Sequence, residues 1–124
     1  MIAADTSSWI SFFEGDEGQD VLALTKALQA RQVVMAPPVL TELLSDPELS
    51  PSVAQILLEL PMVPLKEGFW QRAGKLRSRA LARKRKARLG DALIAQCCID
   101  ADIPLITRDG DFKAFAETLK LKLF

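Results

Sequence analysis

The sequence contains no histidine and no tyrosine, and its only two cysteines, Cys97 and Cys98, are adjacent. Without histidine, the chain cannot build a Ser-His-Asp triad, a Cys-His pair or a His-ligated zinc site. Two adjacent cysteines cannot frame a disulfide scaffold or a Cys-rich zinc site. The side chains that remain for catalysis are carboxylates, hydroxyls, lysine and arginine.

Long hydrophobic runs are also missing. No apolar run approaches the ~18 residues that a membrane span needs, and the N-terminus lacks the basic-then-apolar pattern of a secretory signal. We therefore expect a cytoplasmic protein that has no membrane partner. The 124 residues are 49% hydrophobic and 26% charged, an ordinary globular composition. This length predicts a single domain over residues 1–124.

The net charge is zero, but the charges are segregated along the chain. Residues 1–65 carry two basic and nine acidic side chains, residues 66–88 ten basic and one acidic, and residues 89–124 four basic and six acidic. A basic segment beside acidic ones suits a phosphate polymer that is cut with the help of a metal ion. A solvated lysine- and arginine-rich helix explains the charge pattern equally well.

Short apolar segments alternate with helical patterns. We expect strands at residues 2–5, 33–35, 62–65, 104–107 and 121–124. We expect helices after Thr6-Ser7-Ser8 and over residues 19–31, 37–45, 53–60, 66–88, 92–99 and 112–119. Strands that alternate with helices predict an α/β protein, a three-layer α/β/α sandwich with a mainly parallel central sheet.

Three acids stand where such a fold binds ligands or anions. Asp5 ends the first predicted strand and Asp109 follows the fourth, and open parallel sheets bind ligands beyond the carboxyl ends of their strands. Asp91 stands at the start of the predicted core helix, where the helix dipole favours a carboxylate. Each acid also has a plainer interpretation: a polar strand end for Asp5, an N-cap for Asp91 and a turn residue for Asp109.

Two further acids have weaker support. Glu42 lies ~130° from the centre of its helix's apolar stripe, which predicts a solvent-facing side chain. Asp111 is assigned mainly to capping the next helix. Together, however, the acids suggest a metal site, because each pair of carboxylates ~5 Å apart repels by roughly 3 kcal/mol at an effective dielectric of 20. All-oxygen ligands select Mg²⁺ or Mn²⁺, which activate water for phosphodiester cleavage without histidine.

Four segments, in chain order, place these acids in a recognisable setting. They are Asp5-Thr6-Ser7-Ser8-Trp9-Ile10, Val39-Leu40-Thr41-Glu42-Leu43-Leu44, Gly90-Asp91-Ala92-Leu93-Ile94-Ala95 and Leu105-Ile106-Thr107-Arg108-Asp109-Gly110-Asp111-Phe112. Together they resemble the acidic motifs of PIN-domain ribonucleases, especially VapC-type toxins of toxin–antitoxin pairs. The resemblance implies that Asp5, Glu42, Asp91 and Asp109 are catalytic and hold Mg²⁺, with Mn²⁺ as a substitute, and that Asp111 is a further candidate ligand.

The same resemblance implies an endoribonuclease that forms homodimers and binds a small cognate antitoxin. The hydroxyls of Thr6, Ser7 and Thr107 would support the carboxylates or donate to a phosphate. The candidate RNA-binding residues are basic: Arg79, Arg83, Lys84, Arg85, Lys86 and Arg88. Two alternatives are a non-catalytic module that binds RNA or protein through residues 66–88, and a DNA-directed or flap nuclease. The chain is short for the duplex-gripping elements of a DNA-directed or flap nuclease.

Overall fold

A short parallel strand pair lies at the centre of the computed structural model, which describes residues 1–117 and 119–124. Strand β1 (Ala3–Ala4) pairs with β2 (Leu105–Ile106), with Ala3 opposite Leu105. Single parallel bridges extend the pair on both sides, joining Ile2 to Val33, Met35 to Met62 and Leu105 to Leu123. Within the described ranges, every pairing is therefore parallel, and three of the predicted strands contribute only single bridges. Prolines on both sides of Met62-Val63 lack the backbone N–H that a longer ladder would need.

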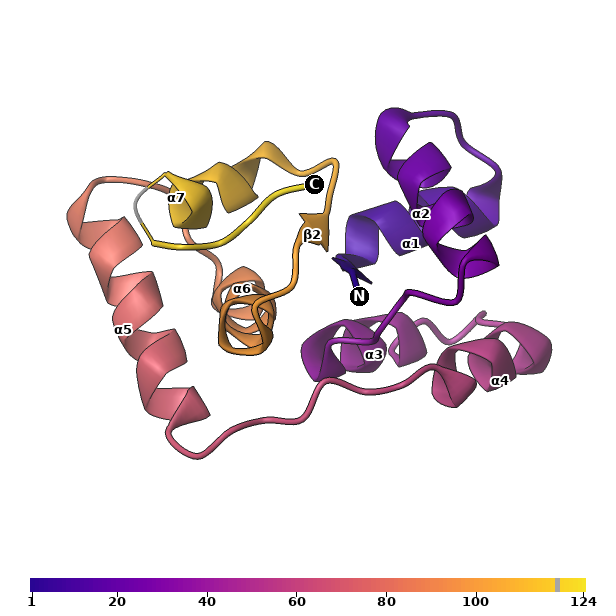
Figure 1. Cartoon of the computed structure of the whole chain (residues 1–124), viewed down its shortest axis with the longest axis horizontal. Helices are drawn as coiled ribbons and strands as arrows, with labels where there is room; N and C mark the ends of the chain where they lie inside the picture. The colour runs from indigo at the N-terminus through magenta and orange to yellow at the C-terminus, as the bar shows by residue number, and fades with distance from the viewer. Residues whose placement is uncertain (118) are drawn as a thin grey trace.

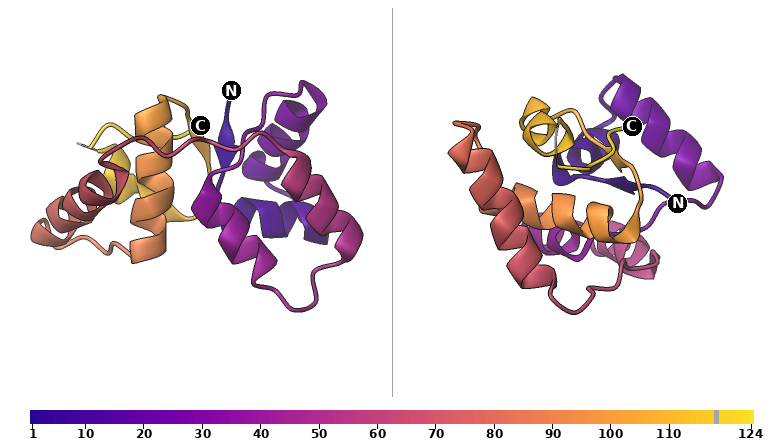
Figure 2. Two further views of the ribbon diagram at one scale, coloured as in Figure 1. Left: turned by 90° about the horizontal axis from the view of Figure 1, so that it is seen from below. Right: turned by 60° about the vertical axis from the view of Figure 1, so that its left-hand side comes forward.

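Helices cover both faces of the strands. They are α1 (Thr6–Glu14), α2 (Gln19–Gln29), α3 (Pro37–Leu44), α4 (Pro51–Glu59), α5 (Phe69–Ala82), α6 (Leu89–Ala101), the short 3₁₀ helix η1 (Gly110–Phe112) and α7 (Lys113–Ala116). The strands run between α1, α2 and α7 on one side and α3, α4 and α6 on the other, as Figure 1 and the right-hand view of Figure 2 show. Helix α5 packs along α6. The predicted α/β sandwich is confirmed.

The predicted basic helix over residues 66–88 is wrong at both ends. Helix α5 begins after Gly68, whose φ of +83° lies in the left-handed region. It ends at Ala82, where Lys84 has a φ of +63° and the N–H of Arg85 donates to the carbonyl of Ala80. A longer helix would place like charges three and four residues apart, which destabilises it. Arg79 is thus helical, whereas residues 83–88 form the loop that leads into α6.

Two boundaries change the predicted roles of acids. Helix α6 begins at Leu89 with Arg88 as its N-cap residue, so Asp91 lies in the first turn and is not the N-cap. Asp109, and not Asp111, caps the η1 turn, because its carboxylate accepts the N–H of Asp111 at 2.9 Å. The predicted helix over residues 112–119 is shorter, ending at Ala116, and Thr118 lies outside the described residues.

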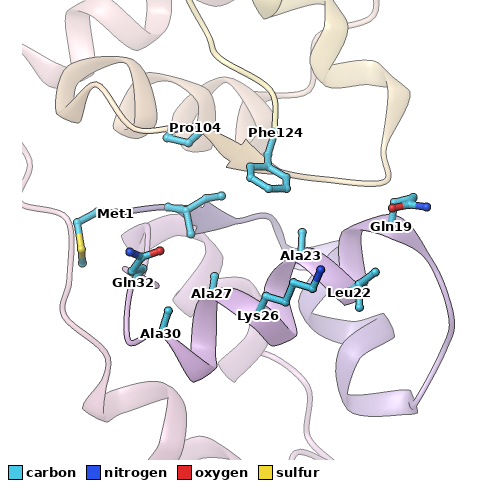
Figure 3. A pocket seen from close by; sticks show the side chains of 11 residues that line it. Met1, Gln19, Leu22, Ala23, Lys26, Ala27, Ala30, Gln32, Pro104 and Phe124 are labelled. Atoms are coloured by element: carbon cyan, nitrogen blue, oxygen red, sulfur yellow. The ribbon is translucent and has the colours of Figure 1, made fainter.

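The core forms around α6, whose small and apolar side chains are buried on most sides. The bulky side chains of Trp9, Phe69, Phe112 and Phe115 fill the space between the layers. A cavity of about 520 Å³ lies between α2 and the chain ends (Figure 3). Its described lining includes Lys26 but no acidic side chain, unlike the strand ends where the predicted acids lie. No described helix combines the length and hydropathy that crossing a membrane requires.

Candidate metal centre

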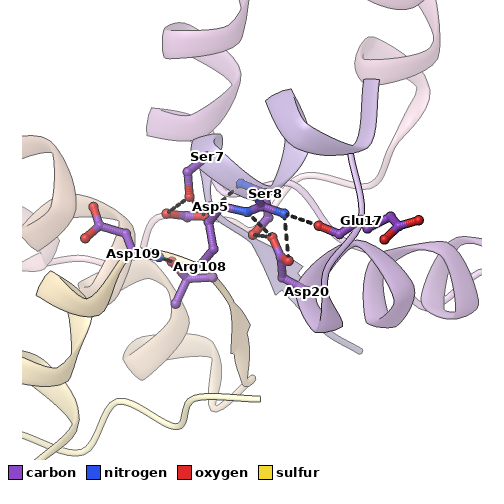
Figure 4. A network of polar contacts seen from close by, with 8 residues as sticks. Asp5, Ser7, Ser8, Glu17, Asp20, Arg108 and Asp109 are labelled. Carbon is purple, nitrogen blue, oxygen red and sulfur yellow. Dashed lines mark hydrogen bonds and ion pairs between the residues drawn. The ribbon is translucent and has the colours of Figure 1, made fainter. Parts of the chain in front are cut away.

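Asp5 follows β1 and is held by several hydrogen bonds. Its backbone N–H donates to the carbonyl of Ile106 at 2.9 Å, which ties it to the end of β2. Its buried carboxylate caps α1, accepting the N–H of Ser8 at 3.2 Å and the hydroxyl of Ser7 at 2.9 Å (Figure 4). Burial raises the pKa of Asp5, and the bonds from Ser7 and Ser8 partly offset that shift. Asp5 is therefore both a helix cap and a charge held beside the strand ends.

Among the described residues, Asp91, Asp109 and Asp111 form a tight group of acids. Each offers one carboxylate oxygen, and these oxygens all lie within 4.8 Å of one another. Ligand oxygens on a single Mg²⁺ are about 3 to 4 Å apart, so small side-chain rotations would bring the three onto one ion. The sequence predicted mainly a helix-capping role for Asp111. The residue instead contributes to this group because the η1 turn places it beside Asp109.

Asp91 carries the clearest sign of a cation-binding position. Its Oδ2 atom is buried and finds no hydrogen-bond partner among the residues that the structure describes. The pKa of Asp91 is raised to about 6, first by burial and then by the charge of Asp109. Asp5 and Glu42 add smaller upward shifts, whereas the charge of Arg88 lowers the pKa. An unpaired buried carboxylate is costly unless a proton or a cation neutralises it. The donor set thus fits a hard divalent ion.

Glu42 stands at the edge of this group. It is exposed on α3, as its position off the apolar stripe predicts. Its Oε1 accepts the hydroxyl of Thr6 at 2.7 Å, and its Oε2 would lie 3.8 Å from a Cβ atom placed on Gly90. The side chain is therefore directed toward the start of α6, and its charge acts on Asp91. Asp5 and Glu42 lie outside the tight group of three but within its electrostatic reach.

Comparison with known proteins identifies the fold. A family model described as PIN domain matches residues 2–118. The chain belongs to the PIN domain family. One similar solved structure is FitAcB from Neisseria gonorrhoeae, with 19% identity, coverage of 100% of this chain and 96% of that chain, and a TM-score of 0.71. VapBC2 from Rickettsia felis, bound to a DNA fragment from their promoter, has 20% identity, coverage of 100% and 98%, and a TM-score of 0.70. VapBC-5 from Mycobacterium tuberculosis, of the VapBC family of toxin–antitoxin systems, has 19% identity, coverage of 98% and 95%, and a TM-score of 0.65. No curated protein matches the sequence.

Three hydroxyls of this PIN domain each contact an acid. Thr6 donates to Glu42 and Ser7 donates to Asp5. The Thr107 hydroxyl oxygen accepts the N–H of Asp109 at 2.9 Å and lies close enough to Asp5 to lower its pKa. These contacts orient Asp5 and Asp109 beside the strand ends and Glu42 on α3. Supporting the carboxylates is one of the two roles expected of these side chains.

The basic loop of residues 83–88 lies against the acidic group. Lys86 Nζ is 3.4 Å from Asp111 Oδ2, and the positive charge of Arg88 acts on Asp91. Arg85 pairs with Glu117. Arg79 instead lines a separate groove between α5 and α6, together with Arg72 and Lys75. The loop, more than the helix, therefore brings cations to the edge of the acidic centre.

One further contact in this PIN domain could not be predicted from the sequence. Arg108, between Thr107 and Asp109, pairs with Asp20 at the start of α2, 88 residues away along the chain. Asp20 alone is typical of the first turn of a helix, and Arg108 alone is typical of a turn. No spacing or periodicity relates the two residues, so only the folded structure reveals their pairing.

Proposed function

We propose that this PIN domain is a metal-dependent endoribonuclease and the toxin of a toxin–antitoxin pair. The observation that carries the proposal is the buried, unpaired Oδ2 of Asp91 beside the carboxylates of Asp109 and Asp111. Because the pKa of Asp91 is about 6, the side chain is mostly ionised at neutral pH. Three acids in one small volume then repel one another, and a bound divalent cation would relieve that repulsion.

The residues divide into metal ligands and residues that orient them. Asp91, Asp109 and Asp111 would hold Mg²⁺ or Mn²⁺, with Asp5 and Glu42 completing the negative charge around it. Bound there, the ion would activate a water molecule and offset the charge that develops on a phosphate. Ser7 and Thr107 fix the position of Asp5, and Thr6 fixes that of Glu42. No step in this scheme requires histidine, which the chain lacks.

RNA is the substrate that the resemblance to PIN-domain ribonucleases implies. Lys84, Lys86 and Arg88 in the loop before α6 would neutralise backbone phosphates near the acidic centre, because Lys86 already lies beside Asp111. Arg83, Arg85 and Arg79 are the further candidates for such contacts. Contacts of this kind are electrostatic and independent of base sequence. We therefore expect RNA binding that weakens steeply as salt concentration rises.

The partners are proposed from the similar structures. The Mycobacterium tuberculosis structure belongs to a toxin–antitoxin family, and the Rickettsia felis structure is a VapBC pair on promoter DNA. By analogy, this PIN domain would bind a small antitoxin and form a homodimer. Expression without the antitoxin should arrest bacterial growth, whereas expression of Asp91→Asn should not.

The nuclease proposal is tested by RNA cleavage. The purified chain is incubated with a panel of structured RNAs and matched DNAs in Mg²⁺, Mn²⁺ or EDTA. We expect RNA cleavage in either metal, with loss in EDTA and in Asp91→Asn. The control Asp102→Asn should cleave like the parent, because the Asp102 side chain is exposed and pairs with Lys122 at the surface. Cleavage by the parent in EDTA would contradict the proposal, RNA binding without cleavage would favour the non-catalytic module, and cleavage confined to DNA would favour the DNA-directed nuclease.

A further inference from the structure

Arg108 is the cation covalently nearest to the acidic centre, yet its side chain is directed away from it. Its guanidinium lies toward α2, on the side away from Asp109 (Figure 4). Nε donates to Asp20 Oδ2 at 2.8 Å, and Nη2 donates to Asp20 Oδ1 at 3.0 Å and to the carbonyl of Glu17 at 3.1 Å. These bonds form a two-point ion pair, the geometry in which arginine binds a carboxylate most strongly.

The partner carboxylate is itself held in place. The side chain of Asp20 is only 8% exposed, and its Oδ2 accepts the hydroxyl of the fully buried Ser8 at 2.8 Å. The N–H of the same Ser8 donates to Asp5. Ser8 therefore connects the Arg108–Asp20 pair to the acid at the end of β1.

Gly18 leaves the space in which the pair fits. A Cβ atom at this position would lie 2.6 Å from Asp20 Oδ1 and 2.9 Å from Arg108 Nη2, both closer than real side chains approach. Its φ of +151° also favours glycine. The turn between α1 and α2 thus leaves room for the Arg108 guanidinium beside Asp20.

A guanidinium beside five carboxylates would compete with a metal ion. Arg108 precedes Asp109 directly, and its charge already interacts with that of Asp5. Released from Asp20, its planar fork could pair with the acids of the centre and neutralise them. We propose that Asp20 holds the Arg108 guanidinium outside the acidic centre and so keeps that centre open for a divalent cation. This inference rests on the proposed metal-dependent function, and it makes Asp20 a positioning residue.

A double variant separates this role from a merely structural one. In Asp20→Asn the guanidinium loses its ionic partner and turns toward the centre. In Asp20→Asn/Arg108→Gln the competing charge is gone as well. If Asp20 acted only by supporting the fold, the double variant would bind metal no better than Asp20→Asn. If it acts by retaining Arg108, the second substitution restores metal binding.

The experiment is Mn²⁺ titration calorimetry on the whole chain at neutral pH, with circular dichroism to verify folding. We expect Asp20→Asn to weaken Mn²⁺ binding roughly tenfold. The Mn²⁺ affinity of the double variant and that of Arg108→Gln should both lie within about threefold of the parent's affinity. Ser8→Ala, which removes one hydrogen bond to Asp20, should also weaken Mn²⁺ binding, by a smaller factor than Asp20→Asn. This variant replaces Asp20→Asn in the test if Asp20→Asn does not fold. Asp102→Asn/Lys122→Gln, at a surface ion pair, is the matched control and should leave affinity unchanged.

Two results would overturn the inference: unchanged affinity in both Asp20→Asn and Ser8→Ala, or a double variant that binds Mn²⁺ as weakly as Asp20→Asn. Both require a parent that binds Mn²⁺, so they leave the proposed function intact. A parent that binds no Mn²⁺ would refute the proposed function itself, together with this inference.

Discussion

Replacing Asp91 by asparagine should stabilise the metal-free protein. The pKa of Asp91 stands at about 6, against an ordinary value of 3.8. Two units of difference correspond to about 3 kcal/mol lost from the free energy of unfolding once the side chain is ionised. Solvent contact at this half-buried position reduces the expected gain to about 1–2 kcal/mol. For a domain of this size, that gain would raise Tm by roughly 3–8 °C at neutral pH in EDTA.

The pH dependence has a definite sign. Asp91 binds its proton more tightly in the folded protein than in the unfolded chain. Its stabilising contribution to the free energy of unfolding is therefore fully present below pH 3.8. It is lost as the pH rises through about 6. Unfolding of the parent in EDTA should therefore become easier between pH 4 and pH 6. Burial also raises the pKa of Asp5, so Asp91→Asn should show a smaller slope, not a flat one.

The assay is thermal unfolding followed by circular dichroism, with EDTA or saturating Mn²⁺. Mn²⁺ should stabilise the parent markedly and Asp91→Asn little, since binding to the folded state alone raises stability. Asp102→Asn, an exposed acid, should behave like the parent in both conditions. A lower Tm for Asp91→Asn in EDTA, or equal stabilisation of parent and Asp91→Asn by Mn²⁺, would refute the reasoning.

Three further predictions concern other parts of the molecule. Gly18→Ala should lower the free energy of unfolding by about 2 kcal/mol in urea titrations. The φ of residue 18 favours glycine, and a Cβ atom there would crowd the Arg108–Asp20 pair; an unchanged midpoint would contradict this. Burial raises the pKa of both Cys97 and Cys98 to about 12, so mass spectrometry should find neither thiol alkylated at pH 8 until the chain is unfolded. Lys86→Ala should weaken RNA binding and reduce the slope of log affinity against log salt by about 1, and an unchanged slope would exclude a phosphate contact.

Local sequence patterns predicted the elements whose causes are local. A helix was predicted after Thr6-Ser7-Ser8, and α1 begins slightly earlier, at Thr6 with Asp5 as its cap. Pro37-Pro38 begins α3 as predicted, because proline is favoured in the first turn of a helix. The alternation of strands and helices predicted the parallel sheet, and hence that Asp5 and Asp109 both lie beyond its carboxyl edge. Sheet length was overestimated, because apolar residues between prolines resemble strands even where few ladder bonds can form.

The remaining features depend on contacts that no local pattern encodes. The run of cations at residues 83–86 has good helix propensity, but the repulsion within it and the left-handed Lys84 end the helix before it. Asp111 joins the acidic group through the geometry of a 3₁₀ turn, which periodicity does not predict. Glu42 is exposed as periodicity predicts, yet the packing of α3 beside α6 directs it toward Asp91. The Arg108–Asp20 pair joins two residues 88 positions apart in the sequence, which no local pattern relates.

The most direct test of the account is a crystal structure of the protein grown or soaked with Mn²⁺, using the anomalous signal of the ion. We expect one strong peak among the carboxylates of Asp91, Asp109 and Asp111, with oxygen ligands about 2.2 Å away and Asp91 Oδ2 among them. An anomalous map with no peak at these residues at millimolar Mn²⁺, or with peaks only elsewhere on the surface, would contradict the claim that these acids form a metal centre.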